Sequence, residues 1–109
     1  METKIAVFKG KGIRKVIHNN EWWFSIMDVI AVLTDSKDPA GYIKDMRRRD
    51  EELSKGWGQI ATPLLLETSG GKQKVNCANA EGIFRIIQSI PSRDNYLGVP
   101  EKRKRLEKK

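Results

Sequence analysis

The segment Lys44-Asp45-Met46-Arg47-Arg48-Arg49 holds the side chains best suited to bind an anion. If this segment is helical, Lys44, Arg47 and Arg48 lie on one exposed face. Cations on such a face can contact DNA phosphates and guanine edges. Acidic residues follow at once, and residues 44–52 carry four basic and four acidic side chains. Pairs such as Arg47–Glu51 and Arg48–Glu52 could instead form a neutral, solvated face, so both interpretations stay open.

Lys72 and Lys74 flank an expected turn at residues 68–71 and alternate onto one face of a strand. Lysines at the tip of a hairpin can hold a phosphate backbone. They can equally protect an exposed strand edge against aggregation. The basic end of the chain, residues 102–109, can likewise add sequence-independent affinity for phosphates or serve only solubility.

The tryptophans are candidates for contact with a partner. Trp22 and Trp23 are adjacent, so on a strand they point to opposite faces. One of them belongs to the core, and the other covers the second face of the sheet or contacts a partner, for which Trp23 is the candidate. Trp57 lies between Gly56 and Gly58, which predict a flexible break. Its ring therefore either plugs one end of the core or contacts a partner.

The composition argues against several kinds of chemistry. Cys77 and His18 are the single cysteine and histidine, so neither an internal disulfide nor a Cys/His zinc site can form. The sequence has no phosphate-loop, dinucleotide-binding or nucleophile-elbow motif. Carboxylates such as Asp28 and Asp45 are better explained by helix capping and surface pairing than by catalysis. We therefore expect no catalytic residue, no metal and no cofactor.

The charge of this 109-residue chain is unevenly distributed. The net charge is +7, but residues 100–109 contain six basic and two acidic residues and carry +4. Residues 1–99 contain 15 basic and 12 acidic residues and carry only +3. There is no apolar run of the roughly 18 residues that a membrane helix needs, and the first residues lack a signal-peptide pattern. These features favour a soluble cytoplasmic protein with no membrane contact.

Hydrophobic periodicity and turn residues predict a small α+β domain. The expected strands are residues 4–8, 13–18, 22–24, 59–67 and 72–77. The expected helices are residues 26–33, 39–52 and 80–90, which begin after the caps Ser25, Asp38 and Asn79. Turns are expected at 10–12, at 19–20 and at 68–71. Pro63 restricts its strand to a sheet edge or a bulge.

The order of these elements predicts an arrangement like a winged helix. The first three strands form a small antiparallel meander. Helices 26–33 and 39–52 resemble a helix-turn-helix, and the hairpin at 59–77 has the shape of a wing. The third helix follows the hairpin.

The motifs, taken in order, resemble the Bro-N domain, which is found in phage antirepressors, baculovirus Bro proteins and some DNA-damage-inducible bacterial proteins. The matching segments are residues 5–8, the strand around Arg14, and residues 21–29, 42–44, 68–71 and 79–87. Residues 21–29 look like the family's W-F-x-x-x-D-V pattern. Residues 79–87 look like its N-x-x-G-(L/I)-(Y/F)-x-L-I helix. The resemblance implies an α+β domain that binds DNA in regulators of phage genes, without enzyme activity or cofactor.

The resemblance covers residues 4–91, and the departure from the family follows Ser92. The family usually continues there into a helix with a Phe-x-x-Trp-like pair, whereas this chain turns basic. We therefore expect a Bro-N-like domain at 1–91 and a divergent basic tail at 92–109. The apolar stripe of helix 80–90 could then be covered by a second copy of the chain or by another partner.

Two functions are consistent with these features. A DNA-binding phage or prophage regulator would contact double-stranded DNA through helix 39–52 and the 68–74 hairpin. The contact residues would be Lys44, Arg47, Arg48, Arg49, Lys72 and Lys74. Alternatively, a phage-encoded module would inhibit a phage repressor or a host protein without contacting DNA, using Trp23 and Trp57. The nearly neutral body favours the second function, and a homodimer is compatible with both.

Overall fold

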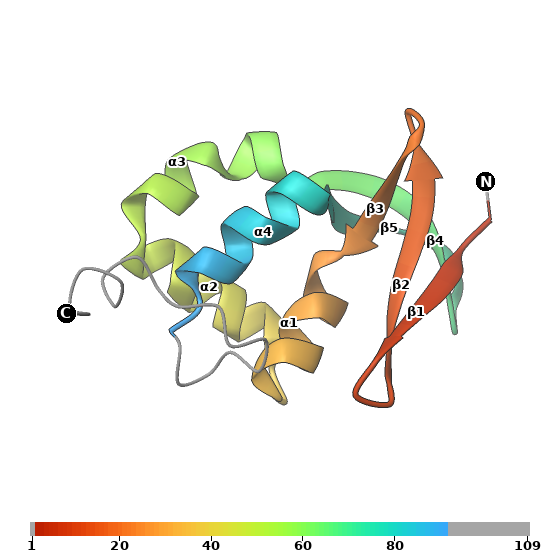
Figure 1. Cartoon of the computed structure of the whole chain (residues 1–109), viewed down its shortest axis with the longest axis horizontal. Helices are drawn as coiled ribbons and strands as arrows, with labels where there is room; N and C mark the ends of the chain where they lie inside the picture. Colours follow the sequence, from red (N-terminus) through yellow and green to blue (C-terminus); the bar gives the residue numbers. More distant parts are fainter. Residues whose placement is uncertain (1, 92–109) are drawn as a thin grey trace, which may run out of the picture.

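The computed structural model describes residues 2–91, which form one antiparallel sheet and four helices (Figure 1). The elements in chain order are β1 (Lys4–Phe8), β2 (Lys11–His18), β3 (Glu21–Ser25), α1 (Ile26–Thr34), α2 (Pro39–Arg49), α3 (Glu51–Ile60), β4 (Thr62–Thr68), β5 (Gly71–Asn79) and α4 (Ala80–Ser89). The predicted α+β class is confirmed. The basic tail expected at 92–109 lies outside the described residues.

The strands follow the order β1-β2-β3-β5-β4 across the sheet, so the predicted meander of the first three strands is confirmed. Asn19 and Asn20 turn the chain between β2 and β3 with φ values of 53° and 66°, which asparagine tolerates. Pro63 lies on β4, at one edge of the sheet, as predicted. The turn expected at 10–12 instead lies at Lys9 and Gly10, where both residues have positive φ.

The sheet curls strongly, so that its two edges come together. The hydroxyl of Thr3, next to β1, accepts a hydrogen bond from the backbone N–H of Glu67 on β4 at 3.0 Å. A small cluster of strand side chains fills the curve, comprising Val16, Leu64, Leu66 and Cys77. Because Thr3 immediately precedes β1, this hydrogen bond ties the start of one edge strand to the other edge and partly protects it.

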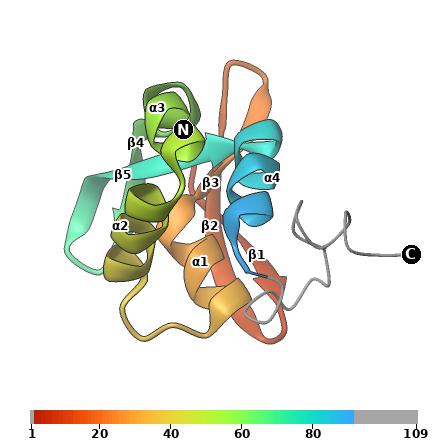
Figure 2. The same ribbon diagram turned by 90° about the vertical axis from the view of Figure 1, so that its left-hand side faces the viewer.

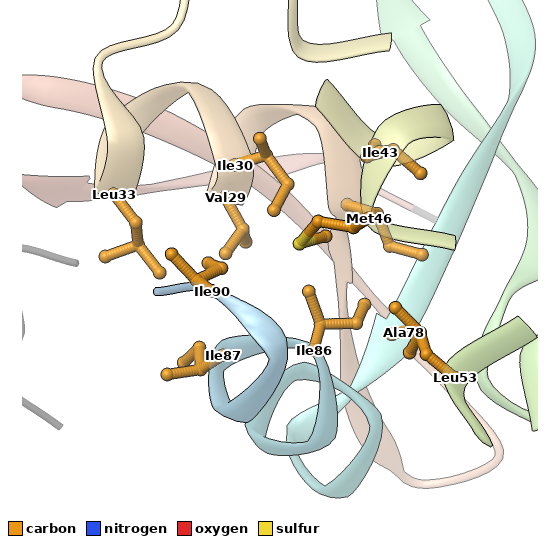
Figure 3. Close-up of a cluster of buried hydrophobic side chains, with 11 residues drawn as sticks. Val29, Ile30, Leu33, Ile43, Met46, Leu53, Ala78, Ile86, Ile87 and Ile90 are labelled. Atoms are coloured by element: carbon orange, nitrogen blue, oxygen red, sulfur yellow. The ribbon is translucent and has the colours of Figure 1, made fainter. Parts of the chain in front are cut away.

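The main core lies between the helices and the sheet (Figure 3). Its buried side chains come from all four helices of the described chain and from β5 and are Ile26, Val29, Ile30, Leu33, Ile43, Met46, Leu53, Ala78, Ile86, Ile87 and Ile90. The helices lie together on one side of the sheet, toward the viewer in Figure 2. The helical stripes predicted from the sequence therefore meet in one cluster.

The predicted helix starts are confirmed by their caps. The side chain of Ser25 accepts a hydrogen bond from the N–H of Asp28, and that of Asp38 from the N–H of Gly41. Asn79 caps α4 in the same way by accepting from the N–H of Gly82 at 2.9 Å.

The prediction of one helix over 39–52 followed by a flexible break at 56–58 is wrong. α2 ends at Arg49, Asp50 is extended, and α3 runs through both glycines. Asp50 accepts hydrogen bonds from the N–H of Leu53 at 3.0 Å and from the hydroxyl of Ser89 at 2.7 Å. Leu53 is fully buried in the core and Trp57 packs against it, so tertiary contacts outweigh the poor helix propensity of glycine.

The winged-helix-like arrangement is not confirmed. Three helices of the described chain, rather than two, precede the hairpin. The hairpin also belongs to the single sheet, because residues 77–79 of β5 pair with β3. The remaining part of β4 and β5 projects past β3 beside the helices (Figure 2). β4 begins at Thr62 rather than at 59, since α3 occupies the residues before it.

Candidate nucleic-acid interface

A groove of about 570 Å³ separates α2 and α3 from the projecting part of β5. Its lining residues are Arg14, Ile26, Met27, Ala40, Ile43, Arg47, Trp57, Thr68, Gln73, Lys74, Val75 and Asn76. Three of these described residues are cations and none is a carboxylate. The groove therefore brings positive charge from β2, α2 and β5 to one place, although the segments are far apart in sequence.

Among the candidate cations on α2, Arg47 is the one that is partly buried in the domain. It lies in the last turn of α2, and its guanidinium carbon is 4.8 Å from the centre of the Trp57 ring. Its Nε is buried and has no hydrogen-bond partner among the described residues. Trp57 lies on α3 rather than in a loop, so its ring forms one wall of the groove beneath Arg47.

The other basic residues of α2 are exposed. Lys44 and Arg48 line a second hollow with Arg47 and with Ser54 of α3, on the side of α2 that faces α3. The Nη2 of Arg48 lies 2.8 Å from the carboxylate of Asp45 on the same helix. Arg49 donates to the backbone carbonyl of Asp45 at 3.4 Å, and helical spacing puts it off the Lys44–Arg47–Arg48 stripe.

The break between α2 and α3 at Asp50 places the basic and the acidic side chains of residues 44–52 on different helices, apart from Asp45, which stays on α2. The basic residues close α2, whereas Glu51 and Glu52 open α3. Glu51 pairs with Lys55 at 3.4 Å and Glu52 with Arg85 at 3.9 Å. Because α2 ends before residue 51, the alternative pairs Arg47–Glu51 and Arg48–Glu52 do not lie one turn apart on a single helix. Each set of charges also lies at the helix end that it favours electrostatically.

Lys72 and Lys74 are exposed on β5. Lys74 lines the groove beside α2, whereas Lys72 does not. In the strand register Lys72 lies opposite Glu67 of β4, and Lys74 lies opposite Leu65. Both lysines also line a shallow hollow with Pro63 on the hairpin, so they share a face as predicted.

Sequence reasoning missed three groove residues, Arg14, Gln73 and Asn76. Arg14 forms an ion pair with Asp28, with Nε to Oδ2 at 2.8 Å and Nη2 to Oδ1 at 2.9 Å. The same carboxylate accepts the backbone N–H of Arg14 at 2.9 Å. Burial alone would raise the pKa of Asp28, but the hydrogen bonds and charge of Arg14 outweigh it and lower that pKa. No local pattern in the sequence indicates this pairing.

Trp23 and Trp22 differ in exposure. Trp23 packs against the strand cluster, and its indole N–H donates to the carbonyl of His18 at 3.0 Å. Trp22 is 36% exposed, and the ammonium of Lys15 lies 4.0 Å from the centre of its ring. Both tryptophans therefore already have contacts within the domain, and Trp22 is the one that reaches the surface.

A second groove, of about 350 Å³, is apolar. Its described lining residues are Phe8, Ile13, Phe24, Val29, Leu33, Ala80, Ile83, Phe84 and Ile87, none of which is charged. Phe84 on α4 is 53% exposed and forms the open side of the groove. An exposed aromatic side chain beside a hollow lined by apolar residues can accept an apolar side chain of a partner.

Residues 2–91 contain no cluster of three metal-ligating side chains. Within the same residues, no helix has the length and apolarity that spanning a bilayer requires. Cys77 is buried, and this burial raises the pKa of its thiol to about 11. The thiol of Cys77 is thus held in its protonated form at neutral pH.

The fold and the groove define a small α+β domain with a cationic hollow between a helix and a hairpin. A family model, Bro-N, described as BRO family, N-terminal domain, matches residues 12–105. The chain therefore belongs to the Bro-N family. Bro-N is a family of regulatory domains, and membership suggests a domain of the phage antirepressor type. Neither the curated proteins nor the solved structures give a match.

Proposed function

We propose that this domain binds double-stranded DNA as a regulator of the phage antirepressor type in the cytoplasm of a bacterial host. The contacts come from α2 and from the 68–74 hairpin. The observation that carries the proposal is the groove between α2 and β5, where the cations Arg47 and Lys74 line one hollow together with Arg14, whose charge is paired with Asp28. A cationic hollow of this kind attracts a phosphate backbone.

The separation of charges at Asp50 supports this proposal. On a single helix over residues 44–52, the four basic and four acidic side chains would cancel each other's charge and disfavour DNA binding. Because the chain breaks at Asp50, the acidic residues turn into α3 and contact Lys55 and Arg85. Lys44 and Arg48 remain exposed on α2. On α2, Lys44 thus offers its ammonium to a phosphate, and Arg48 can do so by exchanging its exposed ion pair with Asp45.

The dimensions of the elements fit the same proposal. A single helix of 11 residues can enter the major groove, which is about 12 Å wide. On the projecting hairpin next to it, Lys72 and Lys74 are exposed, and both would contact the flanking backbone. Phosphate contacts from both elements would fix the orientation of α2 on the duplex.

The test compares two triple variants that lose the same charge. Lys44, Arg48 and Lys74 are replaced by alanine in one, and the exposed lysines Lys4, Lys37 and Lys55 in the other. Binding to a fluorescent duplex is measured over a series of salt concentrations. The first variant should lose at least tenfold in affinity, and its log–log salt slope should fall by about 0.9 for each phosphate contact removed. Equal losses for both variants, or no binding by the unchanged protein, would contradict the proposal.

A second candidate function is inhibition of a phage repressor or host protein without DNA. The apolar groove around Phe84 favours it, because such a surface is suited to a protein rather than to a phosphate. The domain would form a stoichiometric complex with a purified phage repressor that persists at high salt. Phe84→Ser should abolish this complex. If the complex survives this substitution, the groove is not the contact surface.

A further inference from the structure

We propose that Arg47 is the specificity-determining residue of the DNA interface and reads the edge of a guanine base. Lys44 and Arg48, which line a hollow with Arg47, hold phosphates, and so does Lys72 on the hairpin. This inference rests on the proposed function. It assigns different roles to residues that the sequence presents as one basic cluster.

Arg47 differs from the other basic residues of α2 in how it is held. Lys44, Arg48 and Arg49 are exposed, whereas Arg47 is half-buried against Trp57. Its guanidinium lies over the indole ring, with 4.8 Å between its carbon and the ring centre. An arginine held in this way loses less conformational entropy when it binds, and its planar donors keep a fixed direction. These are the properties needed for a bidentate contact with guanine O6 and N7.

The buried Nε of Arg47 is an unused hydrogen-bond donor. It has no partner among the described residues, although a buried donor normally has one. Arg47 also lines the hollows on both sides of α2. Among the described residues, it shares this position only with Ala40 and Ile43. The Arg47 side chain therefore borders both hollows, while its Nε itself is buried.

The neighbours of Arg47 in the groove are suited to recognition of bases. Gln73 and Asn76 contribute amides from β5, and amide side chains pair with adenine edges. Lys74 provides a cation at the same wall. The hollow on the other side of α2 contains Lys44, Arg48 and Ser54, which are all exposed. The two sides of α2 thus differ, because the amides that can pair with bases line the hollow near β5, whereas the hollow near α3 is lined by exposed cations and Ser54 without an amide.

The competing explanation is that Arg47 only covers the ring of Trp57. In that case, replacement of Arg47 would change stability and leave the preferred DNA sequence unchanged. A base-reading role predicts the opposite for Arg47→Lys, since lysine keeps the charge but loses the planar pair of donors. The sequence preference and the salt dependence therefore separate the two explanations.

The experiment first selects preferred duplexes from a random library with the unchanged protein. Affinities are then measured for the selected duplex and for duplexes in which each G·C pair is replaced by A·T. Arg47→Lys should reduce the discrimination at one G·C pair by roughly tenfold or more, with an unchanged salt slope. The control Lys44→Ala should weaken binding to all duplexes by one common factor and lower the salt slope.

Two further variants test the support given by Trp57, which acts as a positioning residue. Trp57→Phe keeps an aromatic ring under the guanidinium and should retain most of the discrimination. Trp57→Leu keeps an apolar side chain against the core but removes the ring, so it should lose discrimination at an unchanged salt slope, with circular dichroism as the check on folding. Arg47→Gln serves as a second test at position 47. An unaltered preference in Arg47→Lys and Arg47→Gln, or binding without any preference by the unchanged protein, overturns this inference alone. Absence of duplex binding by the unchanged protein overturns the proposed function as well.

Discussion

The two grooves of this domain are built from neighbouring elements but have opposite chemistry. The groove between α2 and β5 is lined by three cations and two amides, whereas the groove between α1 and α4 is lined only by apolar residues of the described chain. The core cluster that includes Met46, Ile86 and Ile87 lies between them. One core thus supports two surfaces, and the chemistry of each surface indicates the class of partner that it can take.

The largest effect is expected from removing a core side chain between the grooves. Met46 is 1% exposed and joins α2 to α1 and α4 in the core. Met46→Ala should lower the free energy of unfolding by about 2–5 kcal/mol, because it leaves a cavity. Chemical denaturation measures this change. A loss below 1 kcal/mol would indicate that α2 is not packed as described, and the cationic groove would then lack its support.

A smaller loss is expected at the ion pair that positions Arg14 in the cationic groove. Asp28→Asn should cost about 1–3 kcal/mol, because it removes charge-assisted hydrogen bonds from a half-buried arginine. The pKa of Asp28 lies below its ordinary value of 3.8, so its stabilisation is present above that pH. It is lost as the pH falls through the lowered pKa.

The pH dependence of unfolding checks this prediction about Asp28. The difference in stability between the unchanged protein and Asp28→Asn should be constant near neutral pH and shrink in strongly acidic solution. A difference that grows as the pH falls would show that Arg14 does not lower the pKa of Asp28.

A substitution in the apolar groove serves as the contrast to substitutions in the cationic groove. Phe84 is more than half exposed, so Phe84→Ser should lower the free energy of unfolding by roughly 1 kcal/mol at most. Its affinity for duplex DNA should equal that of the unchanged protein, because the residue lies in the other groove. Thermal unfolding and fluorescence anisotropy measure the two quantities. A large loss of DNA affinity would mean that the two grooves do not have separate functions.

The smallest effect tests α3, which forms the Trp57 wall of the cationic groove. An added Cβ at Gly56 would have no atom within 4 Å. If α3 is helical there, Gly56→Ala should raise the free energy of unfolding by about 0.5–1 kcal/mol. Gly58→Ala provides a parallel measurement, since its surroundings are equally open. A decrease for both variants would support the flexible break that the sequence suggested.

Much of the fold could be predicted because its signals are local. The strands of the meander alternate, the Asn19-Asn20 turn has its preferred residues, and Ser25, Asp38 and Asn79 mark helix starts. α3 could not be predicted with the same rules, because two glycines lower its helix propensity and only burial of Leu53 and Trp57 against the core offsets them. One local signal was available, since Asp50 precedes two acidic residues as a helix cap does.

The candidate site was predictable only in part. Arg47 and Lys74 stood out as cations, and the structure brings both into one groove. Arg14 and the amides Gln73 and Asn76 gave no local signal, because strand pairing and the curl of the sheet decide where they lie. The contact between the Trp57 ring and the Arg47 guanidinium depends on α3, which could not be predicted from the sequence.

The most direct test of the two-groove account is a map of where DNA touches the protein. Backbone amide chemical shifts of the labelled protein are followed while a duplex is added at low salt. Shifts should change over α2 and residues 71–76, with Trp57 and Arg47 among the largest, and stay constant over α4. Changes concentrated on α4 around Phe84, or no change at any amide, would contradict the claim that the α2–β5 groove binds DNA.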